Sequence, residues 1–245
     1  MTFTERERTP GYTVRLLDKD NEEELKEVQR LRWKYLLREF DPGISEDGID
    51  DDGYDAYSDS IIVTENGTGR IVGTYRVATA ETLRGEPFKS EEEFDISALK
   101  NACGGIAEAG RAVVHGDHRN GAVIGLLWRG LISYAAGHGL RYVIGTCSLH
   151  GTDPSVYTDC TSVLRAEYVY REHDVHAIRH PFEYGTRTDI SADNADIPGL
   201  LKSYLRIGAR VSSDGFVDHV FKSCDVLIIL DLQNANERLL KRILG

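Results

Sequence analysis

The hydrophobic pattern of the chain changes between the two-residue period of strands and the roughly 3.6-residue period of helices. Between Asn21 and Phe40 the apolar residues recur at helical spacing, which predicts a long helix. Two apolar runs flank Asn66–Gly69, and an Asn-Gly pair between such runs predicts a β-hairpin. Further strands are predicted over 12–17 and 175–178, and further helices over 90–100, 156–170, 198–207 and 236–244.

The segment from Ile106 to Pro154 is the most informative part of this pattern. It predicts a strand with Glu108 and Arg111, a polar turn, an apolar helix and a buried strand. A helix that starts after such a turn presents unpaired backbone N–H groups, which can hold a phosphate. The segment therefore indicates a site for a phosphate-bearing carrier arm beside a charged strand, as acyl transfer requires.

The succession of elements predicts one mixed α/β (α+β) unit. The run from Asp225 to Leu232 is continuously apolar in its middle, as in a strand buried on both faces. No internal repeat or low-complexity linker interrupts the chain. We expect a flexible N-terminus over 1–11, a core over 12–154, and a C-terminal part over 155–245 that completes the same domain.

Composition narrows the class of protein further. The 245 residues carry a formal net charge of −11, which argues against nucleic acid as a partner. The four cysteines form no CxxC pair, so no metal is expected, and Cys147 in an apolar strand is interpreted as a buried hydrophobic residue. No apolar run is long enough to span a bilayer and no secretory signal precedes the first strand, so cytoplasmic residence is expected.

Glu108 and Arg111 are the first candidate catalytic residues. Three residues apart on a strand, they point to opposite faces unless a bulge intervenes. Glu108 could take a proton from an attacking amine, directly or through a water, because an amine is protonated at neutral pH. Alternatively, each residue makes a structural ion pair of its own.

The polar turn and the helix start supply the candidate binding residues. His115 and His118 could assist with the proton or with phosphate, or could simply be solvated. Arg119 could bind phosphate in bidentate fashion, and a glycine at the helix start lets a ligand approach the backbone. The candidate residues for the carrier arm are His118, Arg119, Asn120, Gly121 and Ala122.

The acidic segment between Asp41 and Asp59 is predicted to be a loop. Such a charge run is usually a solvated surface. Its spacing does not match the calcium-binding loop of an EF-hand. A further interpretation is that some of its carboxylates bind the cationic amine of a substrate.

These motifs together resemble the GNAT acyltransferase superfamily, and in particular its ornithine-lipid N-acyltransferases and N-acyl amino acid synthases. The resemblance rests on E-x-x-R at Glu108 and Arg111, H-x-x-x-R-x-G from His115 to Gly121, LLWRGL from Leu126, and GTDP from Gly151. It extends over nearly the whole chain after about residue 12. It implies a mostly antiparallel central sheet with flanking helices and a C-terminal extension.

A more distant similarity to acyl-homoserine-lactone synthases gives a place to further charged residues. In those proteins arginines and an acidic D-x-x-Y-D element form an electrostatic cluster near the site. The matching residues here, which the resemblance implies as substrate-binding, are Arg32, Asp52, Asp55 and Arg76, beside Glu108 and Arg111.

One departure from the family bears on the acyl donor. Acetyl-CoA-dependent GNAT enzymes carry Q/R-x-x-G-x-G/A before the helix, whereas this chain has His118-Arg119-Asn120-Gly121-Ala122-Val123. The weaker pyrophosphate cradle favours acyl carrier protein, whose arm bears a single phosphate. Arg119, Arg129 and Arg141 are candidates for the basic patch that such an acidic carrier requires.

The resemblance implies direct transfer of an acyl group, without a covalent enzyme intermediate. A backbone N–H near Val113 or Val114 would polarise the thioester carbonyl, as an oxyanion-hole donor does. The apolar residues beyond Pro154 are candidates to shelter the acyl tail. No cofactor is expected to stay bound, since acyl carrier protein or acyl-CoA serves as co-substrate.

The leading hypothesis is transfer of a long-chain acyl group, plain or 3-hydroxylated, from acyl carrier protein to the α-amino group of ornithine or another amino acid. Peripheral contact with the inner face of the membrane belongs to this hypothesis. The alternatives are a CoA-dependent acetyltransferase, a signal synthase resembling the lactone makers, and a non-enzymatic regulator that binds acyl carrier or lipid.

Overall fold

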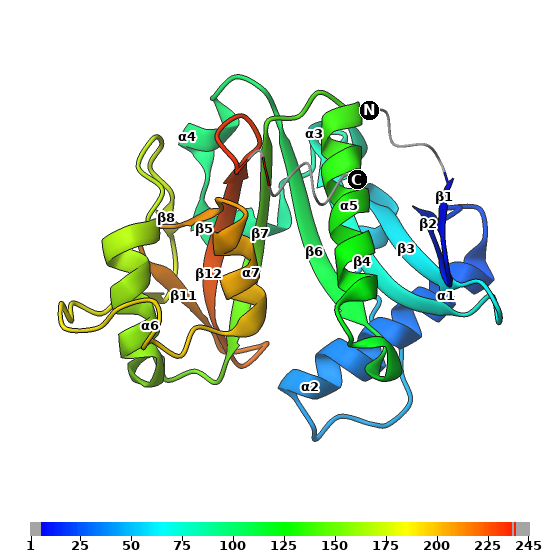
Figure 1. Cartoon of the computed structure of the whole chain (residues 1–245), viewed down its shortest axis with the longest axis horizontal. Coiled ribbons are helices and arrows are strands. Elements are labelled where there is room, and N and C mark those ends of the chain that lie inside the picture. Colours follow the sequence, from blue (N-terminus) through cyan, green and yellow to red (C-terminus); the bar gives the residue numbers. More distant parts are fainter. Residues whose placement is uncertain (1–5, 237, 239–245) are drawn as a thin grey trace. The chain divides into compact units, whose positions relative to one another are not determined.

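The computed structural model of the chain (Figure 1) describes residues 6–236 and 238. The described residues form two compact units. Unit 1 comprises residues 6–86 and 107–140, and unit 2 comprises residues 87–106 and 141–236. The sequence-based boundaries at residues 12 and 155 do not coincide with this division. Part of the N-terminal segment expected to be flexible forms a strand, β1.

Unit 1 is built on an antiparallel sheet with the strand order β1-β2-β3-β4-β6. The predicted hairpin is present, because β3 and β4 pair on either side of residues 66–70. The antiparallel pairing confirms the predicted mixed α/β class. The strands are β1 (Arg6–Thr9), β2 (Tyr12–Leu16), β3 (Asp59–Glu65), β4 (Ile71–Thr79) and β6 (Ile106–Val114).

The predicted long helix of unit 1 begins at a capping residue, since the side chain of Asn21 accepts a hydrogen bond from the backbone N–H of Glu24 at 3.1 Å. It consists of α1 (Glu22–Arg32), one π-helical turn (Trp33–Leu37) and α2 (Arg38–Phe40). The other helices are the 3₁₀ turns η2 (Tyr54–Tyr57) and η4 (Gly116–His118), together with α3 (Ala80–Leu83) and α5 (Ala122–Gly137).

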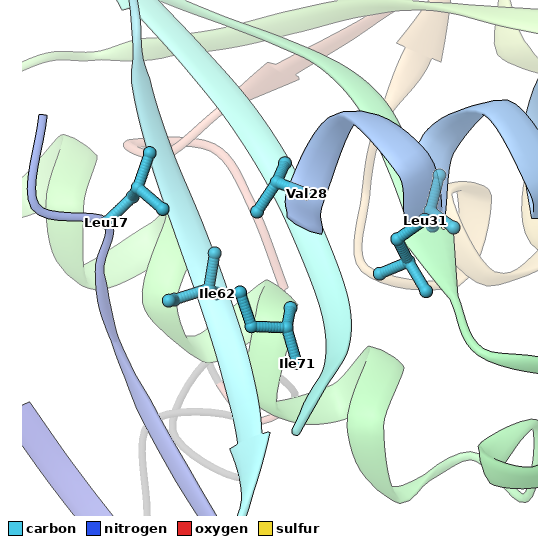
Figure 2. Close-up of a cluster of buried hydrophobic side chains, with 6 residues drawn as sticks. Leu17, Val28, Leu31, Ile62 and Ile71 are labelled. Carbon is cyan, nitrogen blue, oxygen red and sulfur yellow. The ribbon is translucent and has the colours of Figure 1, made fainter. Parts of the chain in front are cut away.

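Helices α1 and α5 cover opposite faces of the unit 1 sheet. Figure 2 shows Val28 and Leu31 of α1 beside Leu17, Ile62 and Ile71 in one buried cluster. A bulge in the β3–β4 register at Val63/Thr64 lets Ile71 point to this face while Gly73 faces α5. A Cβ atom on Gly73 would lie 2.5 Å from Val123 Cγ1, so α5 packs directly on the backbone of β4.

The long strands of unit 2 are antiparallel, and the full lengths of β7 and β12 pair from Tyr142↔Asp231 to His150↔Ser223. Strand β12 is buried along its whole length, as its apolar run predicts. Strands β10 and β11 pair with β12, and β9 pairs with β11. The strands are β7 (Tyr142–His150), β9 (Pro181–Phe182), β10 (Arg210–Val211), β11 (Gly215–Asp218) and β12 (Ser223–Asp231).

The predicted helices of unit 2 are present, with one difference. The helix expected over 90–100 is divided by β5 (Phe94–Asp95), which pairs with β8 (His176–Ala177). Phe94 is 1% exposed, so its burial favours a strand over helical continuity. The helices are η3 (Lys89–Glu92), α4 (Ser97–Lys100), η5 (Pro154–Tyr157), α6 (Thr158–Val163), a π turn (Leu164–Tyr168) and α7 (Gly199–Arg206).

The remaining sequence expectations concern the cysteines, membranes and the C-terminus. Burial raises the pKa of the Cys147 thiol to about 12, which agrees with its interpretation as a buried hydrophobic residue. Among the described helices, none has the length and apolar character needed to cross a bilayer. The helix expected over 236–244 lies almost entirely outside the described residues.

Candidate active site

Three arginines and three aspartates of unit 1 alternate in a closed ring, which we call the ion-pair ring. Arg32 lies 2.6 Å from Asp55 and 2.9 Å from Asp50. Arg76 lies 2.7 Å from Asp52 and 3.4 Å from Asp55. Arg111 closes the ring, 2.9 Å from Asp50 and 3.3 Å from Asp52. The ring therefore contains Arg32, Asp50, Asp52, Asp55, Arg76 and Arg111, and its formal charges cancel.

The ring joins two strands and the long helix to the acidic loop. Arg32 is the last residue of α1, Arg76 lies in β4, and Arg111 lies in β6. All three acids come from the loop. Arg32 is fully buried and donates two hydrogen bonds to the Asp55 carboxylate, at 2.7 and 2.6 Å. The loop is therefore fixed on unit 1 by buried charge, and the carboxylates of Asp50 and Asp55 do not belong to a solvated surface.

Two aspartates of the ring, Asp52 and Asp55, are held in the ionised form. Burial opposes the ionisation of Asp52, but the hydrogen bond from Arg76 and the charges of Arg76 and Arg111 outweigh it, so the pKa of Asp52 is lowered. Burial likewise opposes ionisation of Asp55, and the hydrogen bond and charge of Arg32 lower its pKa. Asp52 and Asp55 consequently keep their charge at neutral pH.

A β-bulge brings the two residues of the E-x-x-R motif to the same region. Thr74 of β4 pairs with Val113, but Arg76 pairs with Gly110, so β6 holds one extra residue in this interval. Arg111 lies in the bulge with φ +55°, a conformation that costs most non-glycine residues free energy. The bulge allows Arg111 to reach Asp50 and Asp52 while Glu108 contacts Tyr54 of the same loop.

Glu108 is 6% exposed and accepts a hydrogen bond from the hydroxyl of Tyr54 at 3.2 Å. Tyr54 begins η2 inside the acidic loop, and the guanidinium of Arg76 lies 5.0 Å from the centre of its ring. The ion-pair ring therefore places a phenol beside the candidate base. A carboxylate and a phenol in contact can accept and relay one proton.

His115 has a different set of contacts. Its Nε2 lies 2.7 Å from the hydroxyl of Tyr35 and also contacts Arg70, while its Nδ1 accepts a hydrogen bond from the backbone N–H of Asp117. Burial and the charge of Arg70 lower the pKa of His115, which favours the neutral imidazole. The imidazole caps η4 in this arrangement. Its predicted catalytic role stays a prediction.

The turn residues before α5 are also held by defined contacts. His118 Nδ1 lies 3.0 Å from the hydroxyl of Tyr12. Arg119 donates to the carbonyl oxygens of Val114 and Tyr35, at 3.2 and 3.1 Å, and pairs with Glu39 at 2.9 Å. The guanidinium of Arg119 therefore already has protein partners, and binding a phosphate would require it to exchange Glu39 for the ligand.

Helix α5 starts as the sequence predicts. Gly121 has φ +91°, the left-handed conformation that glycine adopts at little cost, and a Cβ atom there would meet open space. The side chain of Asn120 accepts from the N–H of Ala122 at 3.0 Å. The following N–H groups of the first turn have no acceptor within an α-helix, so they can face an anion.

Val113 and Val114 lie in register with Thr74 and Gly73 of β4. Because hydrogen-bonded and non-bonded pairs alternate in an antiparallel ladder, one of these two N–H groups points away from β4. The extra residue between Gly110 and Val113 leaves a further backbone group outside the ladder. The end of β6 thus provides candidate donors for a thioester oxygen. Their role stays a prediction.

The three arginines expected to form a basic patch do not all lie in the same unit. Arg119 and Arg129 lie in unit 1, whereas Arg141 lies in unit 2, where it pairs with Asp231 at 2.6 Å. The charge and hydrogen bonds of Asp231 raise the pKa of the Arg141 guanidinium.

Sequence reasoning did not assign Asp50, Tyr54, Tyr35 and Arg70 to the site. The sequence places Asp50 only within the acidic run, although it is 4% exposed and completes the ring. Its neighbour Asp51 is exposed and has the same side chain, so the sequence carries no signal that separates the two. Nothing in the sequence joins Tyr35 and Arg70 to His115, because they come from separate elements.

The family model of the acetyltransferase (GNAT) domain matches residues 31–129, which include the ion-pair ring, Glu108 and the start of α5. The mixed α/β fold agrees with this match. Residues 31–129 therefore match a GNAT acetyltransferase domain, and this match supports an N-acyltransferase activity.

The names of individual relatives state a more specific activity than the family description does. The chain is 29% identical to an L-ornithine N(alpha)-acyltransferase of Rhodobacter capsulatus, over 93% of each chain. It is also 29% identical to the L-ornithine N(alpha)-acyltransferase of Agrobacterium fabrum, over 87% of this chain and 79% of the relative.

Solved structures share the fold at low sequence identity. The CoA-dependent acyl-homoserine lactone synthase BjaI superposes with a TM-score of 0.56 and 16% identity, over 95% of this chain and 88% of the other. A second CoA-dependent lactone synthase, MesI, gives a TM-score of 0.54 and 14% identity over 95% of each chain.

Proposed function

We propose that the protein transfers a long-chain acyl group, plain or 3-hydroxylated, from acyl carrier protein to the α-amino group of ornithine. The similarity to L-ornithine N(alpha)-acyltransferases, which spans 93% of both chains in one case, supports the amine. In this proposal the reaction takes place in the cytoplasm, and the apolar product brings the enzyme to the inner face of the membrane. Acyl-CoA is the alternative donor.

The observation that carries the proposal is the contact between Glu108 and Tyr54 beside the ion-pair ring. The α-ammonium of an amino acid must lose a proton before it attacks a thioester, and Glu108 takes that proton directly or through a water. The hydroxyl of Tyr54 stabilises the carboxylate and orients it. The ring holds the acidic loop so that Tyr54 stays in this position.

The proposed reaction is a direct displacement. The amine nitrogen forms a bond to the thioester carbon, and backbone N–H groups near Val113, Val114 or the bulge stabilise the oxygen of the tetrahedral intermediate. The nitrogen loses two protons in all: the one removed before attack passes from Glu108 to solvent, and the one lost after attack passes through Glu108 or a water to the carrier thiolate as the C–S bond breaks. The result is an amide and a free carrier thiol, without a covalent enzyme intermediate.

The start of α5 supports a carrier protein as the donor. The stretch from His118 to Val123 offers one glycine and one arginine, and Glu39 pairs with that arginine. A single phosphate needs fewer donors than the pyrophosphate of CoA, so this helix start suits a phosphopantetheine arm better.

The test uses the purified full-length protein with ornithine and with each donor in turn: acyl carrier protein loaded with a 3-hydroxy or plain long-chain acyl group, the same acyl-CoA, and acetyl-CoA. Mass spectrometry of the product identifies the acyl group and the acylated nitrogen. We expect Nα-acyl ornithine from the carrier-bound donor. Exclusive use of acetyl-CoA, or no amide from any donor and a panel of other amino acids, would contradict the proposal.

Glu108→Gln tests the proposed base. We expect turnover to fall by about 10²- to 10⁴-fold, as is usual when general base catalysis is lost, with unfolding curves close to wild type. The matched variant Tyr54→Phe removes only the hydroxyl and should lower turnover less. If Glu108→Gln kept wild-type turnover, Glu108 would have a structural role only.

A further inference from the structure

Three carboxylates of unit 2 converge at a place separate from the ion-pair ring. Glu93 follows η3, Asp218 ends β11, and Asp225 lies in β12. One carboxylate oxygen from each lies within 4.8 Å of the other two. We call these three residues the carboxylate trio. A spacing of this size allows one cation to contact all three oxygens, since Ca²⁺ lies roughly 2.3–2.6 Å from its oxygen ligands.

Asp225 is the deepest member of the trio. It is 2% exposed, and within the described part of the chain its Oδ1 atom has no hydrogen-bond partner. Burial raises the pKa of Asp225 to about 6. A buried carboxylate oxygen without a partner is costly, and native proteins rarely keep one without a reason.

The polar groups near Asp225 favour a polar ligand. Ser223, two residues earlier on β12, is fully buried, and its hydroxyl also lacks a hydrogen-bond partner among the described residues. Two backbone N–H groups, from Val220 and Phe221, donate to Asp218 Oδ1 at 2.7 Å each. The Asp218 carboxylate is therefore held in place by backbone N–H groups.

The contrast with unit 1 indicates what the site would bind. Each aspartate of the ion-pair ring contacts two arginines, whereas the described contacts give the Asp225 carboxylate no cationic partner. We propose that the carboxylate trio of Glu93, Asp218 and Asp225 is a cation-binding site. Its ligand is a cation that accepts oxygen donors, either a divalent metal ion or the terminal ammonium of a free amino acid such as ornithine. The choice of ornithine rests on the proposed function.

The variant Asp225→Asn tests this site, because it removes the charge and keeps the shape of the side chain. The mutant should fold, since an unpaired buried charge is lost, and its unfolding temperature without ligand should equal or exceed that of wild type. Asp193→Asn is the matched control, because it removes one exposed carboxylate of the same unit.

Each protein is titrated separately with CaCl₂, MgCl₂, ornithine and norvaline, which is ornithine's side chain without the terminal ammonium. Binding is followed by calorimetry and by thermal unfolding, without an acyl donor. A metal site predicts a rise of about 5 °C or more at roughly 100 times Kd for wild type and Asp193→Asn, and its loss in Asp225→Asn. An ammonium site predicts that ornithine binds about 10-fold or more tightly than norvaline, and that Asp225→Asn removes the difference.

Either result supports a cation site and identifies its ligand. The inference is overturned if none of the four compounds distinguishes Asp225→Asn from wild type. It is also overturned if Asp193→Asn loses the effect equally, because surface charge would then explain the binding. Turnover does not enter these measurements, so a failure of the proposed acyl transfer remains a separate result.

Discussion

Replacing Arg32 by methionine tests the stabilising role of the ion-pair ring. The change keeps the unbranched stem and removes the guanidinium, which is fully buried and contacts Asp50 and Asp55. Breaking a buried ion pair from one side costs about 3–5 kcal/mol, because the remaining charge stays buried. Here Asp50 keeps Arg111 and Asp55 keeps Arg76, so we expect the lower end, about 3 kcal/mol.

Urea unfolding followed by circular dichroism measures this loss, and thermal unfolding should show a midpoint lower by about 6–12 °C. The double variant Arg32→Met/Asp55→Asn removes one charge of each sign. It should be more stable than the sum of the two single changes predicts, by about 1–3 kcal/mol. The reasoning would be refuted if Arg32→Met lost less than about 1 kcal/mol, or if the two substitutions were additive.

Two further predictions concern pH and packing. The lowered pKa values of Asp52 and Asp55 stabilise the fold at pH values above their ordinary range near 4. This contribution to the free energy of unfolding is lost as the pH falls through the lowered pKa values. Arg76→Gln should therefore weaken the pH dependence of the free energy of unfolding between about pH 5 and 2. An unchanged dependence on pH in this range would contradict the reasoning. Gly73→Ala should cost about 1–3 kcal/mol in urea unfolding, because its Cβ would meet Val123 of α5. Gly110→Ala, whose Cβ meets open space, is the control, and an equal loss in both variants would contradict the packing argument.

Hydrophobic periodicity predicted most elements, because the main helices and strands of both units each bury one face or both. It failed over residues 90–100, where a helical pattern contains the buried Phe94 of a short strand. Pairing with β8, which is distant in sequence, determines that strand. Local spacing carries no information about such a partner.

The site was predictable only in part for a similar reason. The resemblance pointed to Arg32, Asp52, Asp55, Arg76 and Arg111, and the structure brings these five together. Asp50 and Asp51 have the same side chain in adjacent positions, and only the folded loop shows which of them is buried. The bulge at Arg111 also depends on tertiary contacts, since no glycine marks the residue with positive φ.

The closed form of the ion-pair ring has a consequence for how this sequence can diverge. Every charge in the ring has two neighbours of opposite sign, so one substitution leaves two residues with a single partner each. A neutral residue can replace one charged residue of the ring without leaving an unbalanced charge when a neighbouring residue of opposite charge in the ring is also replaced by a neutral one. Among homologues, the six positions should therefore vary in neighbouring pairs such as Arg32 with Asp55, or Arg111 with Asp50, and an alignment should show covariation that follows the ring rather than the chain.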